Sequence, residues 1–194
     1  MQSPTPTPTP TPSDVRLAVP ALGRPAPAFA EEALVGRRFE TLRSEALRGR
    51  WVVLFFYPMD FTFVCPTEIA AFNQRLGEFE ERNAAVIGAS TDTVYSHLGW
   101  VGAKEELKDL RYPLIGDVRK TLARAFGVLD EAQGVALRGT FVIDPEGVTR
   151  WVEINDLAVG RSVDEVLRVL DALQTGGLCP CGWTRGEDTL RPEV

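Results

Sequence analysis

The chain has 194 residues, of which 44% are hydrophobic and 25% are charged, a composition typical of one globular domain with a sizeable core. Its formal net charge of -6 is the opposite of the basic surface that nucleic-acid binding needs, so we expect no nucleic-acid partner. No segment approaches the roughly 20 consecutive apolar residues of a membrane span, and the N-terminus lacks the charged and apolar regions of a secretory signal. We therefore expect a cytoplasmic protein with no membrane partner.

The chain begins with a stretch, residues 3–12, in which proline alternates with threonine or serine. Proline has no amide proton and biases the preceding residue toward extended backbone, so this stretch cannot pack into a helix or a sheet. We predict a disordered Thr/Pro-rich tail over residues 1–14. A folded domain over residues 15–174 and a C-terminal segment over residues 175–194 would follow it.

Short β-rich runs then alternate with helical patterns. The apolar run WVVLFFY, residues 51–57, is typical of a strand buried on both faces, and Pro58 closes it. Residues 66–83 carry apolar side chains at helical spacing after Pro66, which suits a first helical turn. Residues 84–90 and 113–117 predict two further strands, and a short helical pattern from residue 120 ends at Gly127.

The last third of the domain contains two β-rich runs on either side of residues 144–147, whose sequence Asp-Pro-Glu-Gly is typical of a hairpin turn. A helical pattern over residues 162–174 follows, with Ser162 or Asp164 near its start. The alternation along the chain predicts an α/β fold, with a central mixed β-sheet flanked by helices.

Three cysteines, Cys65, Cys179 and Cys181, are too few for a fold held together by disulfides and are considered one by one. Cys65 falls at the start of the helix predicted after residue 65, where the positive end of the helix dipole and unpaired amides favour a thiolate. A buried cysteine that only packs remains an alternative for this residue taken alone.

The neighbours of Cys65 favour the reactive alternative. Pro58 and Thr62 stand seven and three residues before it, and this spacing resembles the P-x-x-x-T-x-x-C signature of the peroxiredoxins. The similarity covers roughly residues 22–190 and is greatest to typical two-cysteine peroxiredoxins of the bacterial alkyl hydroperoxide reductase peroxidase-subunit type. The further matching motifs occupy residues 66–68, 137–144, 159–164 and 179–180.

The resemblance implies a thioredoxin-like fold over residues 15–174 and a thiol-dependent peroxidase without cofactor or metal. Such an enzyme reduces hydrogen peroxide and organic hydroperoxides to water or alcohols, and Cys65 would become a sulfenic acid. Thr62 would bond the peroxide and the thiolate, and Pro58 would shield the pocket. Arg138 and the Cys65 amide would stabilise the thiolate and the leaving oxygen. The residues that would orient Arg138 are Glu68 and Arg161.

A second thiol is implied as well. By resemblance Cys179 is the resolving cysteine, which forms a disulfide with Cys65 from the partner subunit of a head-to-tail homodimer, and dimers would assemble into a decamer. Cys181 departs from the family pattern and creates a C-x-C pair, so thiol-disulfide exchange with Cys179 makes it a candidate auxiliary thiol. The reductant would be a flavoprotein alkyl hydroperoxide reductase partner or a thioredoxin-like protein, and the sequence leaves this choice open.

Three other functions were weighed. A zinc site needs four ligands, but His97 is the only histidine and no second cysteine pair accompanies the C-x-C element. A thiol-disulfide oxidoreductase would carry C-x-x-C at the helix start, whereas residues 66–68 are Pro, Thr and Glu. A binding module with chaperone-like holding activity stays open, since nothing in the sequence excludes it.

Overall fold

The computed structural model describes residues 19–192, and the predicted tail of residues 1–14 lies outside this range. Its centre is a seven-stranded sheet in the order β2-β1-β5-β4-β3-β8-β9. The pairs β3–β4 and β4–β5 are parallel and the other neighbouring pairs are antiparallel. The predicted central mixed sheet is therefore confirmed. The strands are β1 Ala30–Val35, β2 Arg38–Arg43, β3 Trp51–Phe56, β4 Ala84–Ser90, β5 Leu114–Gly116, β8 Arg138–Ile143 and β9 Thr149–Asn155.

Strand β3 lies in the interior of the sheet and is buried on both faces, as its apolar run predicts. Its side chains alternate between two hydrophobic cores because successive residues of a strand point to opposite faces. Val53 and Phe55 belong to one core, while Val52 and Leu54 belong to the other. The strand that precedes Cys65 is thus a rigid support held from both sides.

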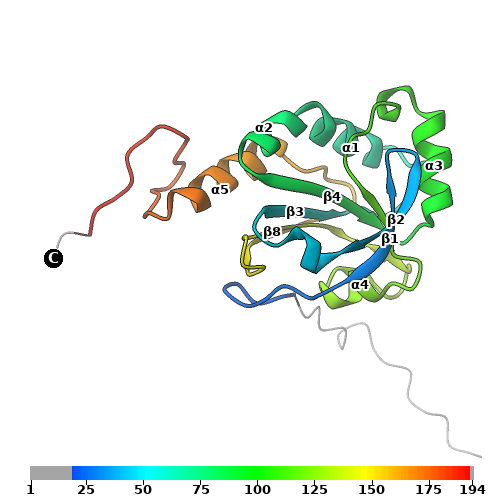
Figure 1. Cartoon of the computed structure of the whole chain (residues 1–194), viewed down its shortest axis with the longest axis horizontal. Coiled ribbons are helices and arrows are strands. Elements are labelled where there is room, and N and C mark those ends of the chain that lie inside the picture. Colours follow the sequence, from blue (N-terminus) through cyan, green and yellow to red (C-terminus); the bar gives the residue numbers. More distant parts are fainter. Residues whose placement is uncertain (1–18, 193–194) are drawn as a thin grey trace, which may run out of the picture.

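The helices cover the two faces of the sheet unequally. Residues of α1, α2, α3 and α5 pack in the core that contains Phe55, whereas α4 and the small β6–β7 hairpin pack in the other core. Figure 1 shows α1 and α3 on one side of the sheet and α4 on the opposite side. The elements are α1 Cys65–Gln74, α2 Leu76–Glu81, α3 Val94–Ala103, α4 Thr121–Ala125, α5 Val163–Thr175, β6 Leu129–Asp130 and β7 Val135–Ala136, with 3-10 turns at Ser44–Leu47 and Glu105–Leu107.

Two differences from the sequence prediction bear on the site. The single helix predicted over residues 66–83 is two helices, because Arg75 leaves helical geometry at φ -97° and ψ 7°. Helix α3 and the hairpin of β1 and β2 were not predicted. Helix α3 begins after Thr93, whose hydroxyl accepts a hydrogen bond from the Ser96 amide. Among the described residues, no helix has the length and apolarity needed to cross a membrane.

The chain after α5 forms a separate arm. Helix α5 starts at the N-cap Ser162, one of the two residues predicted there, and ends where Gly176 takes a φ of 64°. Beyond it, Leu178 and Leu190 form an isolated bridge and Trp183 is buried. Figure 1 shows this arm running away from the sheet beyond α5. We call residues 177–192 the C-terminal arm.

Candidate active site

Cys65 is the first residue of α1 and is completely buried at the end of the loop that follows β3. Pro66 lies in the first turn, where its missing amide proton costs no hydrogen bond. The thiol therefore lies at the positive end of the helix dipole, in the place that the sequence predicted.

Arg138 is the charged group that contacts this thiol. Strand β8 runs antiparallel to β3 with Phe55 opposite Thr140, and this pairing carries Arg138 alongside the residues that follow β3. Its guanidinium Nη1 lies 3.5 Å from the Cys65 Sγ, and its Nε donates to the Leu157 carbonyl at 2.8 Å. Arg138 is only 3% exposed, so it is not a surface arginine.

Glu68 fixes the orientation of Arg138. It stands three residues after Cys65, one turn along the same side of α1, and its Oε2 accepts from Arg138 Nη1 at 2.5 Å. Its Oε1 accepts from the Arg161 Nε at 2.9 Å and from the Arg161 amide at 3.1 Å. Since Glu68 is itself buried, its carboxylate keeps two guanidinium groups in place in the interior.

Arg161 is held by more than Glu68. Its guanidinium donates to the Phe56 carbonyl at 2.7 Å and to the Gly139 carbonyl at 3.1 Å, and it lies 5.0 Å above the centre of the Phe55 ring. Two guanidinium groups and one carboxylate leave this cluster with one excess positive charge. Cys65 faces that charge through Arg138, so the cluster favours a thiolate and any anion formed beside it.

Pro58 and Thr62 lie in the loop that leads to Cys65, and no hydrogen bond joins the Thr62 hydroxyl to the Cys65 thiol. Both side chains are partly exposed, and the Thr62 hydroxyl donates to the Met59 carbonyl at 2.9 Å. Phe61, which directly precedes Thr62, has a φ of 57°, in the left-handed region that a bulky side chain rarely occupies. The loop is therefore strained next to the site.

The other two cysteines lie elsewhere, in the C-terminal arm. All three thiols are free. The Cys179 Sγ lies 3.4 Å from the Thr175 hydroxyl and 3.7 Å from the Ala172 carbonyl at the end of α5. Cys181 is exposed. Within one chain, the structure does not bring these thiols to Cys65.

The sequence did not predict a second polar cluster, which lies next to the loop between β3 and Cys65. Asp60 is buried and contacts His97 on α3, which the sequence offers only as the one histidine of the chain. The apolar spacing of Val94, Trp100 and Val101 is helical and could have predicted α3. Nothing in the sequence pairs Asp60 with a residue 37 positions later.

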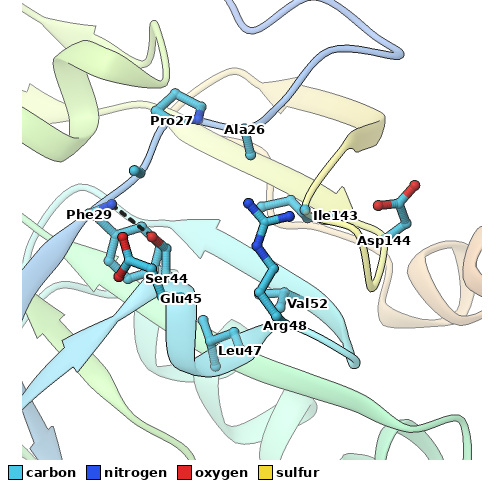
Figure 2. Close-up of a pocket in the computed structure, with 12 residues that line it drawn as sticks. Ala26, Pro27, Phe29, Ser44, Glu45, Leu47, Arg48, Val52, Ile143 and Asp144 are labelled. Atoms are coloured by element: carbon cyan, nitrogen blue, oxygen red, sulfur yellow. Dashed lines mark hydrogen bonds between the residues drawn. The ribbon is translucent and has the colours of Figure 1, made fainter.

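The pocket in Figure 2 is distinct from the thiol site. It has a volume of about 70 Å³ and is lined by Phe29, Val52 and Ile143, which belong to the core on the opposite face of the sheet from Cys65. Its Ser44 hydroxyl accepts a hydrogen bond from the Phe29 amide at 3.1 Å. The pocket contains no thiol. Across residues 19–192, no three His, Cys, Asp or Glu side chains gather in a way that would hold a metal ion.

A mixed sheet flanked by helices, with a buried thiol at a helix N-terminus beside an arginine, is typical of thioredoxin-like thiol proteins. Comparison with known proteins gives the family. Residues 22–152 match the AhpC/TSA family. The chain belongs to this family and is a peroxiredoxin, a thiol-dependent peroxidase.

The similar proteins span most of this chain. The chloroplastic 2-Cys peroxiredoxin BAS1 of Hordeum vulgare is 49% identical over 183 residues, covering 90% of this chain and 87% of the relative. The putative peroxiredoxin YkuU of Bacillus subtilis is 50% identical over 175 residues, covering 87% of this chain and 97% of the relative. The crystal structure of reduced Plasmodium vivax 2-Cys peroxiredoxin aligns with a TM-score of 0.85 at 38% identity, covering 89% of this chain and 93% of that structure. The thioredoxin-like fold is thereby confirmed.

Proposed function

We propose that Cys65 is the residue that attacks peroxide. Its thiolate Sγ attacks one peroxide oxygen, the O–O bond breaks, and the departing hydroxide or alkoxide takes a proton to leave as water or alcohol. Cys65 is left as a sulfenic acid. The observation that carries this assignment is the Arg138 guanidinium 3.5 Å from a completely buried Sγ, because that cation stabilises both the thiolate and the oxygen that becomes negative.

The surrounding residues have roles that follow from their contacts. Glu68 and Arg161 hold Arg138 in position through buried hydrogen bonds. Thr62 is the donor to the peroxide and the thiolate, a role in which its hydroxyl proton turns away from the Met59 carbonyl. Pro58 shields the thiol from water on the side of the loop. The substrates are hydrogen peroxide and organic hydroperoxides, since these groups recognise the O–O unit rather than its substituent.

The sulfenic acid is resolved by a second thiol. The Cys179 thiolate attacks the Cys65 sulfur, the hydroxyl group leaves as water after protonation, and a disulfide forms. Because Cys179 lies in the C-terminal arm, which runs away from the sheet of its own chain, we assign its Cys65 partner to a second subunit. Cys181 is the auxiliary thiol that can exchange with Cys179. Residues 175–194 thus form the resolving segment of the protein.

Two surfaces support assembly into a homodimer and then a decamer. Strand β9 is an edge of the sheet, so its outer backbone groups are available to a second copy. Phe39, Phe61 and Tyr95 are exposed aromatic side chains, and Phe39 contacts Tyr95 edge to face with ring centres 4.9 Å apart. Exposed aromatic side chains of this kind are typical of a surface that a partner covers.

The external partner is a thiol-disulfide reductant, either a flavoprotein alkyl hydroperoxide reductase partner or a thioredoxin-like protein, acting in the cytoplasm. Consumption of hydrogen peroxide with dithiothreitol tests the core of the proposal. Wild type should turn over, and Cys65→Ser should be inactive but folded, because a hydroxyl is a far weaker nucleophile at neutral pH. Substantial turnover by folded Cys65→Ser would refute the assignment of Cys65.

A further inference from the structure

We call residues 57–64, between β3 and Cys65, the active-site loop. His97 is the one histidine of the chain, and its imidazole is completely buried between this loop and β5. Its Nδ1 lies 2.8 Å from the Asp60 Oδ2, and its Nε2 lies 3.1 Å from the Ile115 carbonyl oxygen. A carbonyl oxygen only accepts, so Nε2 carries a proton. Whether Nδ1 also carries one depends on the state of Asp60.

The contacts of Asp60 favour its carboxylate form. The Tyr57 hydroxyl donates to Oδ1 at 3.0 Å, and the Ser96 hydroxyl donates to Oδ2 at 2.8 Å. A carboxyl group that accepts from several donors is stabilised as the anion, and an anion cannot donate to His97. The Tyr57 hydroxyl also lies 3.4 Å from Nδ1, but its one proton is donated to Asp60 Oδ1. Nδ1 then has to be the donor to Asp60 Oδ2. Both ring nitrogens therefore carry protons, and His97 is a buried imidazolium.

The two other ionisable groups near Asp60 and His97, Asp92 and Tyr57, do not compete with Asp60 for the imidazolium. Asp92 accepts from the Asp60 amide at 2.9 Å and from the Ser90 hydroxyl, so it holds the backbone of Asp60 rather than the imidazole. Burial, and then the Asp60 carboxylate, raise the pKa of Tyr57, which keeps its hydroxyl protonated as a donor. The imidazolium thus has one carboxylate in direct contact.

We propose that His97 is a positioning residue for the peroxide reaction, acting as an imidazolium that fixes Asp60 and thereby the active-site loop. Asp60 immediately precedes Phe61, whose φ of 57° is costly for a bulky side chain and has to be maintained by the surrounding contacts. Thr62 follows directly. When His97 loses its charge, Asp60 loses its strongest partner, the loop relaxes, and Thr62 leaves the geometry that peroxide binding requires.

The charge of His97 can be measured directly, because one histidine gives one set of imidazole signals. In untagged protein labelled with ¹⁵N-histidine, both ring nitrogens should show protonated shifts at pH 7.5. Asp60→Asn should convert the ring to the neutral form. A neutral ring in wild type at pH 7.5, or an imidazolium that persists in Asp60→Asn, would overturn the proposal independently of any peroxidase activity.

The positioning role rests on the proposed reaction at Cys65 and is tested by single-turnover kinetics of reduced protein with hydrogen peroxide. His97→Gln, which keeps one donor and one acceptor but no charge, should slow the reaction at least about 10-fold at pH 7.

Leu107→Ala is the matched control, since Leu107 is buried in the core into which Trp100 and Val101 of α3 pack but belongs to a different turn. It should lower stability while leaving the rate within about 2-fold. An equal slowing in His97→Gln and Leu107→Ala would show that His97 only packs. If wild type itself does not react while its ring is charged, the assignment of Cys65 fails and the ion pair stands.

Discussion

Replacing Arg138 by methionine separates the electrostatic role of this residue from its role in packing. Methionine keeps an unbranched apolar stem but removes the guanidinium that lies 3.5 Å from the Cys65 Sγ. Two unit charges at that distance attract by about 5 kcal/mol at an effective dielectric constant near 20. Part of this attraction energy already stabilises the thiolate before the reaction. The attraction that develops as the leaving oxygen becomes negative lowers the reaction barrier.

The expected loss is about 100- to 1000-fold in the second-order rate constant for hydrogen peroxide, the usual effect of removing a preorganised donor from a developing anion. The free energy of unfolding should fall only moderately, because Glu68 keeps its hydrogen bonds to Arg161 and is not left as an unpaired buried charge. We expect a decrease of about 1–2 kcal/mol in the free energy of unfolding. Stopped-flow tryptophan fluorescence and urea denaturation measure the two quantities.

Arg82 provides the control within the same chain. It forms a largely buried ion pair with Asp171, whose side chain is 10% exposed, and neither residue contacts Cys65. Arg82→Met leaves the Asp171 carboxylate buried without its ion-pair partner, so the free energy of unfolding should fall by about 3 kcal/mol or more. The rate constant for hydrogen peroxide should change less than about 2-fold. A loss below about 10-fold in Arg138→Met, or similar losses in both variants, would refute the electrostatic argument.

Two further predictions concern resolution and pH. Oxidised wild type should run as a covalent dimer on a non-reducing denaturing gel, whereas Cys179→Ser should not, and a dimer band in that variant would remove Cys179 as the resolving thiol. Burial raises the pKa of Glu153, so the stability that this carboxyl contributes is present at low pH and is lost as the pH rises through its folded-state pKa. Glu153→Gln should therefore gain stability relative to wild type between pH 4.5 and pH 7.5 in urea denaturation, and a constant difference would contradict this reasoning.

The sequence was sufficient for features that depend on local spacing. The apolar run of β3, the apolar period of α5 and the turn at residues 144–147 are each local features of the sequence, so their patterns are visible in the chain. The position of Cys65 at a helix start follows in the same way from Pro66 and the apolar run before it. The predicted long helix was wrong at Arg75, because a continuous apolar period does not record a local break in backbone geometry.

Local spacing does not show which distant residues form charged contacts. The resemblance to the peroxiredoxins predicted those of Arg138, Glu68 and Arg161, and only the tertiary structure showed the pair of Asp60 and His97. Arg138 lies 73 positions from Cys65, Arg161 lies 93 positions from Glu68, and His97 lies 37 positions from Asp60. Each pair is made by strand pairing or helix packing, and no local period encodes it. The burial that makes these charges strong is also a property of the packed whole, since the same side chains on an unfolded chain would be solvated and nearly independent.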